Sequence, residues 1–284
     1  MRESELFCHG KRIDGRLSTE IRIIHTKNNV TKSDGSILLT QGNTQVLVTV
    51  YGPHSDNTKH NKNESVNISC VYNKTPFATI GSDRRVQSFR DRQAIEHAGK
   101  IEEIFSNLVH GTKYKMACID IFVEILQSDG SEFVAAINAV TLALIDAGIE
   151  LHQFVVAATV GLYGNVILSD LNRFEENSNI PRIDIAFTPN QSKEGILKSL
   201  GDKDSSEISS DSDFEHLDRE KENILYLNLS RVVDPRSVEK MIAESQEIGQ
   251  LVYAYLAAQL RQRIISHESV LEANKQLKYT QMVS

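Results

Sequence analysis

Carboxylates that could carry chemistry follow the apolar run at residues 166–171. Asp170 ends this run, Glu175 and Glu176 come shortly after it, and Asp184 lies at the start of the next apolar run. Carboxylates that meet at the end of a strand can hold a metal ion or act as general acid and base. They can equally belong to a solvated loop. Their spacing alone does not decide between these two interpretations.

A glycine turn over Asp129, Gly130 and Ser131 is a second feature with a chemical consequence. Backbone N–H groups in the first turn of a helix are unpaired, and they favour an anion. A phosphate would fit near this turn if an arginine closed over it. The first helical turn instead carries Glu132 and Phe133, and the carboxylate would repel phosphate. These residues alone therefore favour an ordinary core helix after a turn.

A basic stretch at residues 81–92 precedes an expected helix. It carries four arginines within nine residues, namely Arg84, Arg85, Arg90 and Arg92. Arginines gathered at the start of a helix are suited to contacts with phosphate groups. A charged run is more often a solvated face, and this is the simpler interpretation of the stretch by itself. Metal binding has weaker support, because His54 and His60 lie six residues apart in a polar loop, and the sequence predicts no metal site.

The composition is that of an ordinary soluble protein, with 284 residues, 40% hydrophobic residues and a net charge of −7. No apolar run reaches the ~18 residues of a membrane span, and the charged start of the chain lacks the apolar core of a secretory signal. Residues 190–222 contain ten acidic and five basic residues, so the rest of the chain carries only −2. We expect this segment to be an acidic, disordered insertion, and the remaining charge leaves room for a local basic patch.

The chain has an odd number of cysteines, and they lie far apart in the sequence, at Cys8, Cys70 and Cys118. They fit neither a disulfide framework nor a CxxC metal site. We therefore expect reduced thiols, in the cytosol or the nucleus.

Hydrophobic periodicity predicts the elements that position these residues. Residues 118–126 alternate with a period of two and are rich in β-branched residues, which predicts a strand. Residues 135–146 are apolar on nearly every side, which predicts a buried helix that ends at Ala147 and Gly148. A strand thus leads through the glycine turn into a central helix.

Other apolar runs complete a chain of the α/β (α+β) class. Further strands are expected at 36–40, 44–51, 66–72, 154–162, 166–171 and 224–230, with the first two paired in a hairpin. A helix with apolar residues three and four apart is expected after the basic stretch. Pro235 begins a long C-terminal helix whose apolar stripe ends near Ile264, and we expect the polar tail after about residue 268 to fray.

Several of these segments together resemble the RNase PH family. The shared segments are KRIDGR (11–16), GSILLTQGNTQVLVTVYGPH (35–54), the basic run before a helix, IDIFVEILQSDG (119–130), AAINAVTLALIDAGI (135–149) and SDLNRFEE (169–176). The resemblance implies an RNase PH-like fold, with mixed sheets packed with helices and a long C-terminal helix. It predicts a single RNase PH-like domain over residues 1–284, with residues 190–222 as an insertion within it.

The resemblance also implies where a phosphorolytic site would lie. In active members of the family, phosphate attacks the 3′-terminal linkage of RNA and releases nucleoside diphosphates. The phosphate-binding arginine of that site falls on Phe133 and the preceding serine or threonine on Glu132, beside Gly130 and Ser131. Phenylalanine offers none of the donors of arginine, and a clamp of this kind contributes on the order of several kcal/mol. We therefore expect a degenerate phosphate site.

The remaining functional positions of the family are partly kept. The two catalytic acids fall on Asp170 and on Glu176, which is one methylene longer than the usual aspartate. The first of two RNA-binding arginines falls on Arg92, and the second falls on Gln93. Further candidates for RNA contact are Arg84, Arg85 and Arg90.

These residues lead us to expect a non-catalytic ring subunit of the RNA exosome core. Such a subunit scaffolds the ring, lines the RNA channel and supports 3′-to-5′ processing and degradation of RNA, including ribosomal RNA. The alternative is an active phosphate-dependent 3′-to-5′ exoribonuclease, which the retained Asp170 and Arg92 favour. A third hypothesis, based on the net charge of −7, is a stand-alone α/β binding module without RNA.

Partners and location follow from the same resemblance. The implied partners are RNA, other RNase PH-like exosome subunits in a heteromeric six-membered ring, cap subunits of the S1/KH type and a separate hydrolytic nuclease, with no membrane. No cofactor is expected, and inorganic phosphate and Mg²⁺ would be needed only by an active site. The expected location is the nucleus, including the nucleolus, and the cytoplasm.

Overall fold

The computed structural model describes the backbone of residues 7–8, 11–55, 66–79, 91–111, 113–114, 117–164, 166–189 and 223–283, and the side chains of these ranges from residue 11 to residue 265. Two compact units are distinguished, one of Met1–Pro189 with Glu222–Gly249, the other of Asn190–Lys221 with Gln250–Ser284. The elements below belong to the first unit, apart from the C-terminal helix beyond Gly249. The insertion predicted at 190–222 lies outside the described residues, and the single-domain interpretation stays a prediction.

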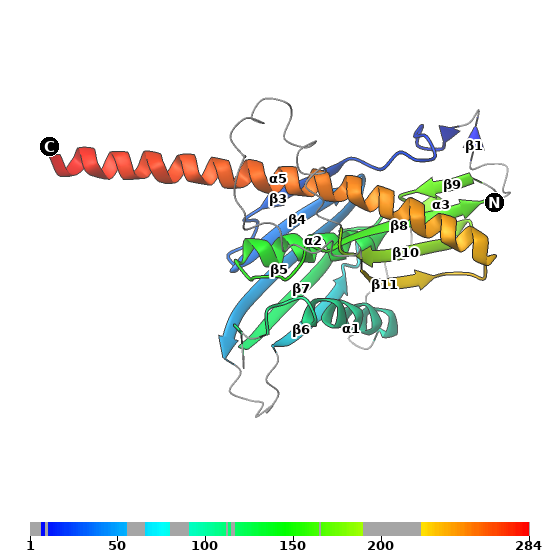
Figure 1. Ribbon diagram of the computed structural model, residues 1–284, viewed down its shortest axis with the longest axis horizontal. Coiled ribbons are helices and arrows are strands. Elements are labelled where there is room, and N and C mark those ends of the chain that lie inside the picture. Colours follow the sequence, from blue (N-terminus) through cyan, green and yellow to red (C-terminus); the bar gives the residue numbers. More distant parts are fainter. Residues whose placement is uncertain are drawn as a thin grey trace, which may run out of the picture. The chain divides into compact units, whose positions relative to one another are not determined.

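A five-stranded sheet has the strand order β3-β4-β5-β7-β6 (Figure 1). Its strands are β3 (Ile24–Asn28), β4 (Gly35–Gln41), β5 (Thr44–Ser55), β6 (Asn67–Lys74) and β7 (Ala117–Gln127). Neighbours are antiparallel except β6 and β7, which are parallel. The predicted hairpin is confirmed as β4 and β5, and Gly42 in its turn has a φ of +59°, which a glycine adopts without strain.

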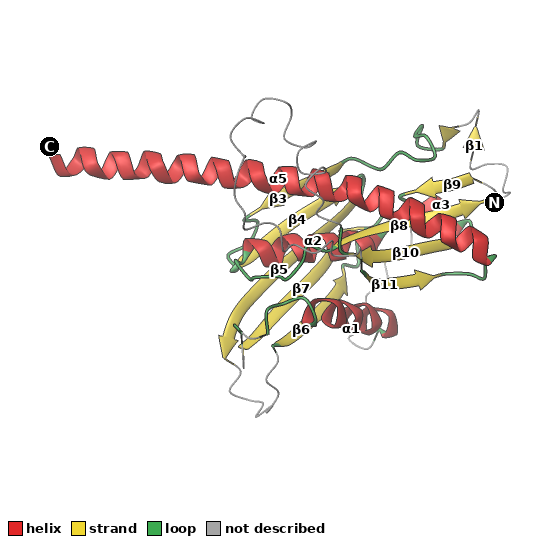
Figure 2. Cartoon of the chain, viewed as in Figure 1, coloured by secondary structure: helices red, strands yellow, loops and turns green. Residues whose placement is uncertain are grey.

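A four-stranded antiparallel sheet has the order β11-β10-β8-β9 (Figure 2). Its strands are β8 (Val156–Tyr163), β9 (Val166–Ser169), β10 (Arg182–Phe187) and β11 (Ile224–Leu229), and the short helix α3 (Arg173–Asn177) follows β9. Near the N-terminus, β1 (Phe7–Cys8) pairs with β2 (Lys11–Arg12). The mixed and antiparallel sheets confirm the α+β class that the sequence predicted.

Helix α2 (Glu132–Asp146) is the central helix that the sequence predicted, and it begins three residues earlier than expected. It packs against β4 and β5 of one sheet and β8 and β10 of the other. Twelve of its fifteen residues are buried, which explains why it has no polar face. Asn138, one of its buried polar residues, exchanges hydrogen bonds of 3.0 and 2.8 Å with the backbone of Ala157 in β8. This exchange satisfies the buried amide and aligns α2 with the strand.

Two further helices lie within the described residues. Helix α1 (Arg92–Ser106) packs on β6 and buries Ile101, Ile104 and Phe105, whereas Ile95 is 60% exposed. Helix α5 (Pro235–Val283) begins at the predicted proline. The prediction of a frayed tail is wrong, because the helix continues to Val283. Glu, Leu, Ala, Lys and Gln make up much of this tail, and their helix propensity is high.

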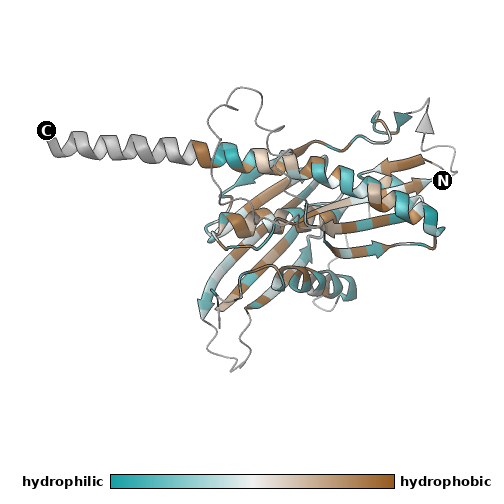
Figure 3. Ribbon diagram, in the orientation of Figure 1, coloured by the Kyte–Doolittle hydropathy of each residue, from teal (hydrophilic) through white to brown (hydrophobic). Residues whose placement is uncertain are grey.

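The hydropathy of the chain follows this arrangement. Brown residues gather along α2 and alternate with teal along the strands in Figure 3. In β7 the buried residues Ile119, Ile121, Val123 and Ile125 alternate with more exposed neighbours, as the period of two predicted. Within the described part of the chain, no helix combines the length and the apolar character that a membrane crossing requires.

Candidate functional site

Asp170 follows β9 directly, in a left-handed backbone conformation with a φ of +52°, and the residue is only 3% exposed. Its Oδ2 accepts hydrogen bonds from the backbone N–H and from Nε of Arg22, both at 2.9 Å. Its Oδ1 accepts from Nη2 of Arg22 at 2.6 Å and from Nε2 of Gln41 at 3.0 Å. Four hydrogen bonds fill the lone-pair positions of the carboxylate and leave none for a substrate or a metal ion.

The charge of Asp170 is stabilised by the same arginine. Burial by itself would raise the pKa of Asp170, but the guanidinium and the hydrogen bonds of Arg22 outweigh burial, so the pKa lies below its usual value. The pKa of Arg22 is raised in return, because the attraction of Asp170 outweighs the effect of burial. An ionised, fully paired carboxylate is a poor general acid. The assignment of Asp170 to catalysis stays a prediction, and its surroundings favour an anchoring role.

Arg22 also holds the glycine turn that precedes α2. Its Nη1 donates to the carbonyl of Asp129 at 2.8 Å and its Nη2 to the carbonyl of Gly130 at 3.4 Å, while Oγ1 of Thr44 donates to the same Gly130 carbonyl at 2.9 Å. Gly130 has a φ of +86°, and a Cβ atom there would lie 2.6 Å from the backbone carbon of Asn172. Only glycine fits this close approach.

A second buried ion pair fixes the short helix after β9. Nε of Arg12 donates to Oε1 of Glu175 at 2.6 Å, and a second contact joins Nη2 to Oε2 of the same carboxylate. Arg12 also donates from Nη2 to the carbonyl of Asp170 at 3.0 Å. Glu175 closes a capping box with Asn172 at the start of α3. Sequence reasoning assigned no role to Arg12 or Arg22, because nothing in the local sequence indicates which distant carboxylate each arginine meets.

A carboxylate of the protein itself contacts the N-terminus of α2. The backbone N–H of Ser131 donates to Oε1 of Glu176 at 2.9 Å. Ser131 has a φ of +53°, and its hydroxyl caps no helical N–H but donates to the carbonyl of Leu171 at 2.9 Å. Ser131 is the N-cap residue of α2, but its side chain makes no capping hydrogen bond. The N–H of Ser131 therefore faces Glu176.

Glu176 belongs to a charged group with Arg182 and Asp184. Nη1 of Arg182 lies 2.8 Å from Oε1 of Glu176, and its Nε lies 3.7 Å from Oδ2 of Asp184. Burial raises the pKa of both carboxyl groups, and the positive charge of Arg182 opposes this rise only in part. The side chain of Glu176 is 20% exposed and that of Asp184 is 10% exposed, so solvent reaches Glu176 more easily.

The two residues at the start of α2 have different partners. The carboxylate of Glu132 pairs with Nζ of Lys74 at 2.6 Å and contacts the hydroxyl of Ser128. Nζ of Lys74 also donates to Oγ of Ser128 at 3.1 Å. This arrangement places a lysine near the first turn, but the lysine charge is already balanced by Glu132.

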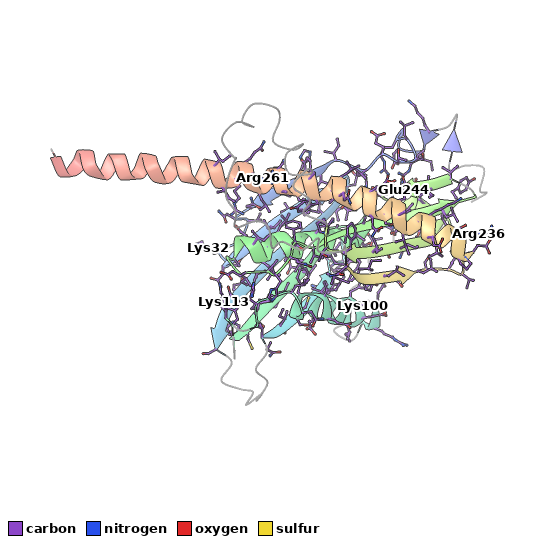
Figure 4. The ribbon with its side chains drawn as sticks, viewed as in Figure 1. Lys32, Lys100, Lys113, Arg236, Glu244 and Arg261 are labelled. Atoms are coloured by element: carbon purple, nitrogen blue, oxygen red, sulfur yellow. The ribbon has the colours of Figure 1, made fainter. Side chains whose placement is uncertain are left out.

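Phe133 lies in a group of rings that we call the aromatic cluster (Tyr72, His97, Phe133 and Tyr226). The ring of Phe133 lies 4.6 Å from that of His97 and 5.2 Å from that of Tyr226, and Tyr72 lies 5.1 Å from His97. Nζ of Lys100 lies 4.9 Å above the Tyr226 ring, and Figure 4 labels Lys100 on α1. Burial lowers the pKa of His97, so its ring is neutral at pH 7.

The predicted RNA-binding arginines fall in two groups. Arg92 is the first residue of α1, its side chain is exposed, and the helix is capped by Asp91, whose Oδ1 accepts from the N–H of Gln93 at 3.2 Å. Arg84, Arg85 and Arg90 lie outside the described residues. Over the described ranges, no group of three or more His, Cys, Asp or Glu side chains is arranged so that it could hold a metal ion.

The fold and this site together define the class of the protein. The family described as 3′ exoribonuclease family, domain 1 (RNase_PH) matches residues 20–150. The exosome complex component RRP41 of Mus musculus is 33% identical over 192 residues, which cover 66% of this chain and 78% of the relative. The chain therefore belongs to the RNase PH family, as its motifs predicted.

Other relatives extend the same relationship. The exosome complex component Rrp41 of Pyrobaculum arsenaticum is 33% identical over 195 residues, which cover 68% of this chain and 78% of the relative. The sequence motifs had suggested a likeness to the exosome subunit ribosomal RNA-processing protein 41, and this likeness is confirmed. Rice Rrp46 has the same fold, with a TM-score of 0.69, 20% identity and coverage of 88% of this chain and 100% of the rice chain. An Archaeoglobus fulgidus exosome structure with RNA bound to the active site superposes with a TM-score of 0.63 and 19% identity, covering 87% of this chain and 92% of that one.

Proposed function

We propose that this chain is a non-catalytic ring subunit of an RNA exosome core. It scaffolds a heteromeric ring with other RNase PH-like subunits, lines the RNA channel and supports 3′-to-5′ processing and degradation of RNA. The observation that carries the proposal is the packing of Phe133, the position of the family's phosphate-binding arginine, inside the aromatic cluster. The names of the relatives support the exosome as the assembly.

The physical argument concerns the phosphate that a phosphorolytic enzyme must hold. An arginine binds phosphate through two charge-assisted hydrogen bonds, and the ring of Phe133 has no donor. The N–H of Ser131, which could contribute, donates to Glu176. Glu132 adds a further negative charge at the first turn. Loss of such an electrostatic clamp removes on the order of several kcal/mol of transition-state stabilisation, so catalysis would be lost even if RNA were bound.

Asp170 and Arg92 take different roles in this proposal. Asp170 anchors Arg22 and, through it, the turn at Gly130. Arg92 is exposed at the start of α1 and contacts RNA phosphates, together with the arginines of residues 84–90. The proposed partners are RNA, the neighbouring ring subunits, S1/KH-type cap subunits and a separate hydrolytic nuclease. The proposed location is the nucleus, including the nucleolus, and the cytoplasm.

One observation favours the alternative of an active phosphorolytic exoribonuclease. The pKa of Glu176 is raised by burial, and a raised carboxyl pKa is common among residues that transfer protons. Activity would also need a phosphate ligand to replace the missing arginine, and the lysine nearest the first turn of α2, Lys74, is already paired with Glu132. We therefore place this alternative second.

The test is RNA degradation by the chain co-purified with its ring neighbours, with and without inorganic phosphate. The readout is the release of nucleoside diphosphates from RNA labelled throughout. We expect that adding inorganic phosphate does not cause this chain to release nucleoside diphosphates. Glu176→Gln is more informative than a change at Asp170, because loss of the Asp170 charge would disturb folding as well as any catalysis. Phosphate-dependent diphosphate release that Glu176→Gln abolishes would overturn the proposal.

A further inference from the structure

An exposed phenylalanine, Phe77, lies on a turn directly after β6. The turn runs from Thr75 to Ala78, and the N–H of Ala78 donates to the carbonyl of Thr75 at 3.0 Å. Phe77 is 65% exposed, whereas Ala78 is fully buried. A single exposed apolar side chain is common in proteins and needs no function by itself. The surroundings of Phe77 therefore decide what its ring can do.

Hydrogen bonds hold the backbone of this turn against β7. The N–H of Thr75 donates to the carbonyl of Ile125 at 3.1 Å, and the Thr75 hydroxyl donates to the same carbonyl at 2.9 Å. The N–H of Ser128 donates to the carbonyl of Ala78 at 2.9 Å. Pro76 has a fixed φ that suits the second position of a β-turn. A ring on so restrained a segment can bind a flat partner with little further loss of backbone entropy.

The start of α1 lies at the same end of β6 as the turn. A carboxylate oxygen of Glu102 accepts from the N–H of Cys70 at 2.7 Å. Earlier in the helix and later in the strand, the ring centroids of His97 and Tyr72 are 5.1 Å apart. Helix and strand therefore run in opposite directions, and Figure 1 shows α1 alongside β6. Arg92 begins α1 and lies about 7.5 Å beyond His97 along the helix, towards the turn after β6.

We propose that Phe77 is a stacking platform for a base of single-stranded RNA, with Arg92 contacting a nearby phosphate of the same strand. The inference rests on the proposed function, because it assigns a contact on the RNA path of that subunit. Every base has a flat face that an aromatic ring can cover, so stacking of this kind tolerates any RNA sequence. Arg92 is exposed and supplies the positive charge that follows the RNA backbone. The ring and the cation together are the combination that single-stranded RNA requires.

A neighbouring protein chain is the competing partner for an exposed ring. An apolar protein contact needs a contiguous patch of apolar side chains. Within the described residues 73–79, Phe77 is the one exposed large hydrophobic side chain. Nearby, Lys74 at the end of β6 pairs with Glu132 at the start of α2, so the surface beside the turn is charged. An isolated ring in charged surroundings fits a base, which needs only one flat face, better than it fits a protein.

The test is the affinity of the assembled complex for single-stranded oligoadenylate, measured by fluorescence anisotropy without inorganic phosphate. Phe77→Ala should weaken binding by about 5-fold to 100-fold, which is the effect of losing one stacked base. Phe77→Tyr should keep the affinity and Phe77→Leu should lose it, because leucine is apolar but has no ring. The slope of log K against log salt should stay unchanged in all three variants, since no phosphate contact is removed.

Two controls separate stacking from other effects. A strand with the same sugar–phosphate backbone but no bases should bind equally well to the unmodified complex and to Phe77→Ala. Phe122→Ala is the matched control variant, because Phe122 is a phenylalanine of β7 that is 37% exposed. It alternates with the buried Ile121 and Val123, so its ring lies on the opposite face of the sheet, and its loss should leave the RNA affinity unchanged.

The possible failures are distinguishable. Equal affinity of the unmodified complex and Phe77→Ala for oligoadenylate would overturn this inference alone. Loss of ring subunits from Phe77→Ala during co-purification would also overturn it, because the ring would then contact protein. Absence of RNA binding by the unmodified complex would overturn the RNA path of the proposed function and this inference with it. Phosphate-dependent release of nucleoside diphosphates would overturn only the non-catalytic part of the proposed function.

Discussion

Two neighbouring parts of the family's site have opposite characters in this protein. We call the first the Asp170 anchor (Asp170, Arg22 and Gln41), a buried polar group in which a carboxylate accepts four hydrogen bonds. The second is the aromatic cluster, in which Phe133 packs against His97 and Tyr226. One part keeps an acid of the family and the other lacks the family's arginine.

Under the proposed function, this difference means that a residue type can be retained for a structural reason when the reaction is lost. Asp170 balances the charge of Arg22. Because Arg22 is only 6% exposed, leaving its charge unpaired would greatly lower the free energy of unfolding. Such an acid is needed for folding whether or not the site is active. A phosphate-binding arginine has no such structural duty, so an apolar ring can replace it and add to the core.

Loss of the Asp170 charge should have the largest effect. Asp170→Ala leaves the guanidinium of Arg22 buried without its partner, and this type of loss costs about 3–5 kcal/mol of the free energy of unfolding. Urea unfolding followed by circular dichroism measures the loss. Asp120→Ala is the control, because Asp120 is 37% exposed at its side chain and pairs with the exposed His54, so a change of about 1 kcal/mol or less is expected. A small effect of Asp170→Ala on folding, with lost RNA degradation, would return Asp170 to catalysis.

The anchor also predicts a dependence of stability on pH. The folded-state pKa of Asp170 lies below the ordinary value of 3.8, so its ionic contribution is fully present above that value. The contribution is lost as the pH falls below 3.8 towards the lower pKa of the folded state, because the carboxyl group is then protonated in both states. The difference in free energy of unfolding between the unmodified protein and Asp170→Asn should therefore be constant from pH 5 to 7 and shrink at lower pH. A difference that grows on acidification would contradict the ion pair.

The aromatic cluster should contribute a somewhat smaller amount. Phe133→Ala removes a ring that is only 7% exposed, and truncation of a core phenylalanine costs about 3 kcal/mol or more. Phe122→Ala on β7 is the matched control, because that ring is 37% exposed and packs mainly on Tyr51, so its loss costs about 1 kcal/mol or less. Thermal or urea unfolding compares the two. If both variants lost equally little, Phe133 would not be part of a packed cluster.

The smallest effect concerns Arg92, for which we propose a contact with RNA and no part in folding. Arg92→Ala removes one proposed phosphate contact, so the affinity of the assembled complex for single-stranded RNA should fall and the slope of log K against log salt should decrease by about 0.7. Fluorescence anisotropy at several salt concentrations measures both quantities. Lys32→Ala, a change of an exposed base between β3 and β4, should leave the slope unchanged. An unchanged slope for Arg92→Ala would remove this residue from the RNA path.

Much of the fold could be predicted because the signals are local. The alternation in residues 118–126 and the uniformly apolar run at 135–146 each fall within one element, and they appear as β7 and α2. The tail of α5 was predicted wrongly for a local reason as well. Its missing apolar stripe was given more weight than its helix propensity, and the helix continues to Val283.

Less of the candidate site could be predicted from the sequence. The sequence alone determined that residue 133 is a phenylalanine, that an acid precedes it, and that the segments match one family, because these are properties of residue types and their order. Only the tertiary structure decided that Asp170 is paired with Arg22, 148 residues away, and that α1 runs opposite to β6, which places Arg92 towards the turn of Phe77. A buried charge takes whichever partner packing brings within hydrogen-bond distance, and no periodicity in the chain encodes that choice.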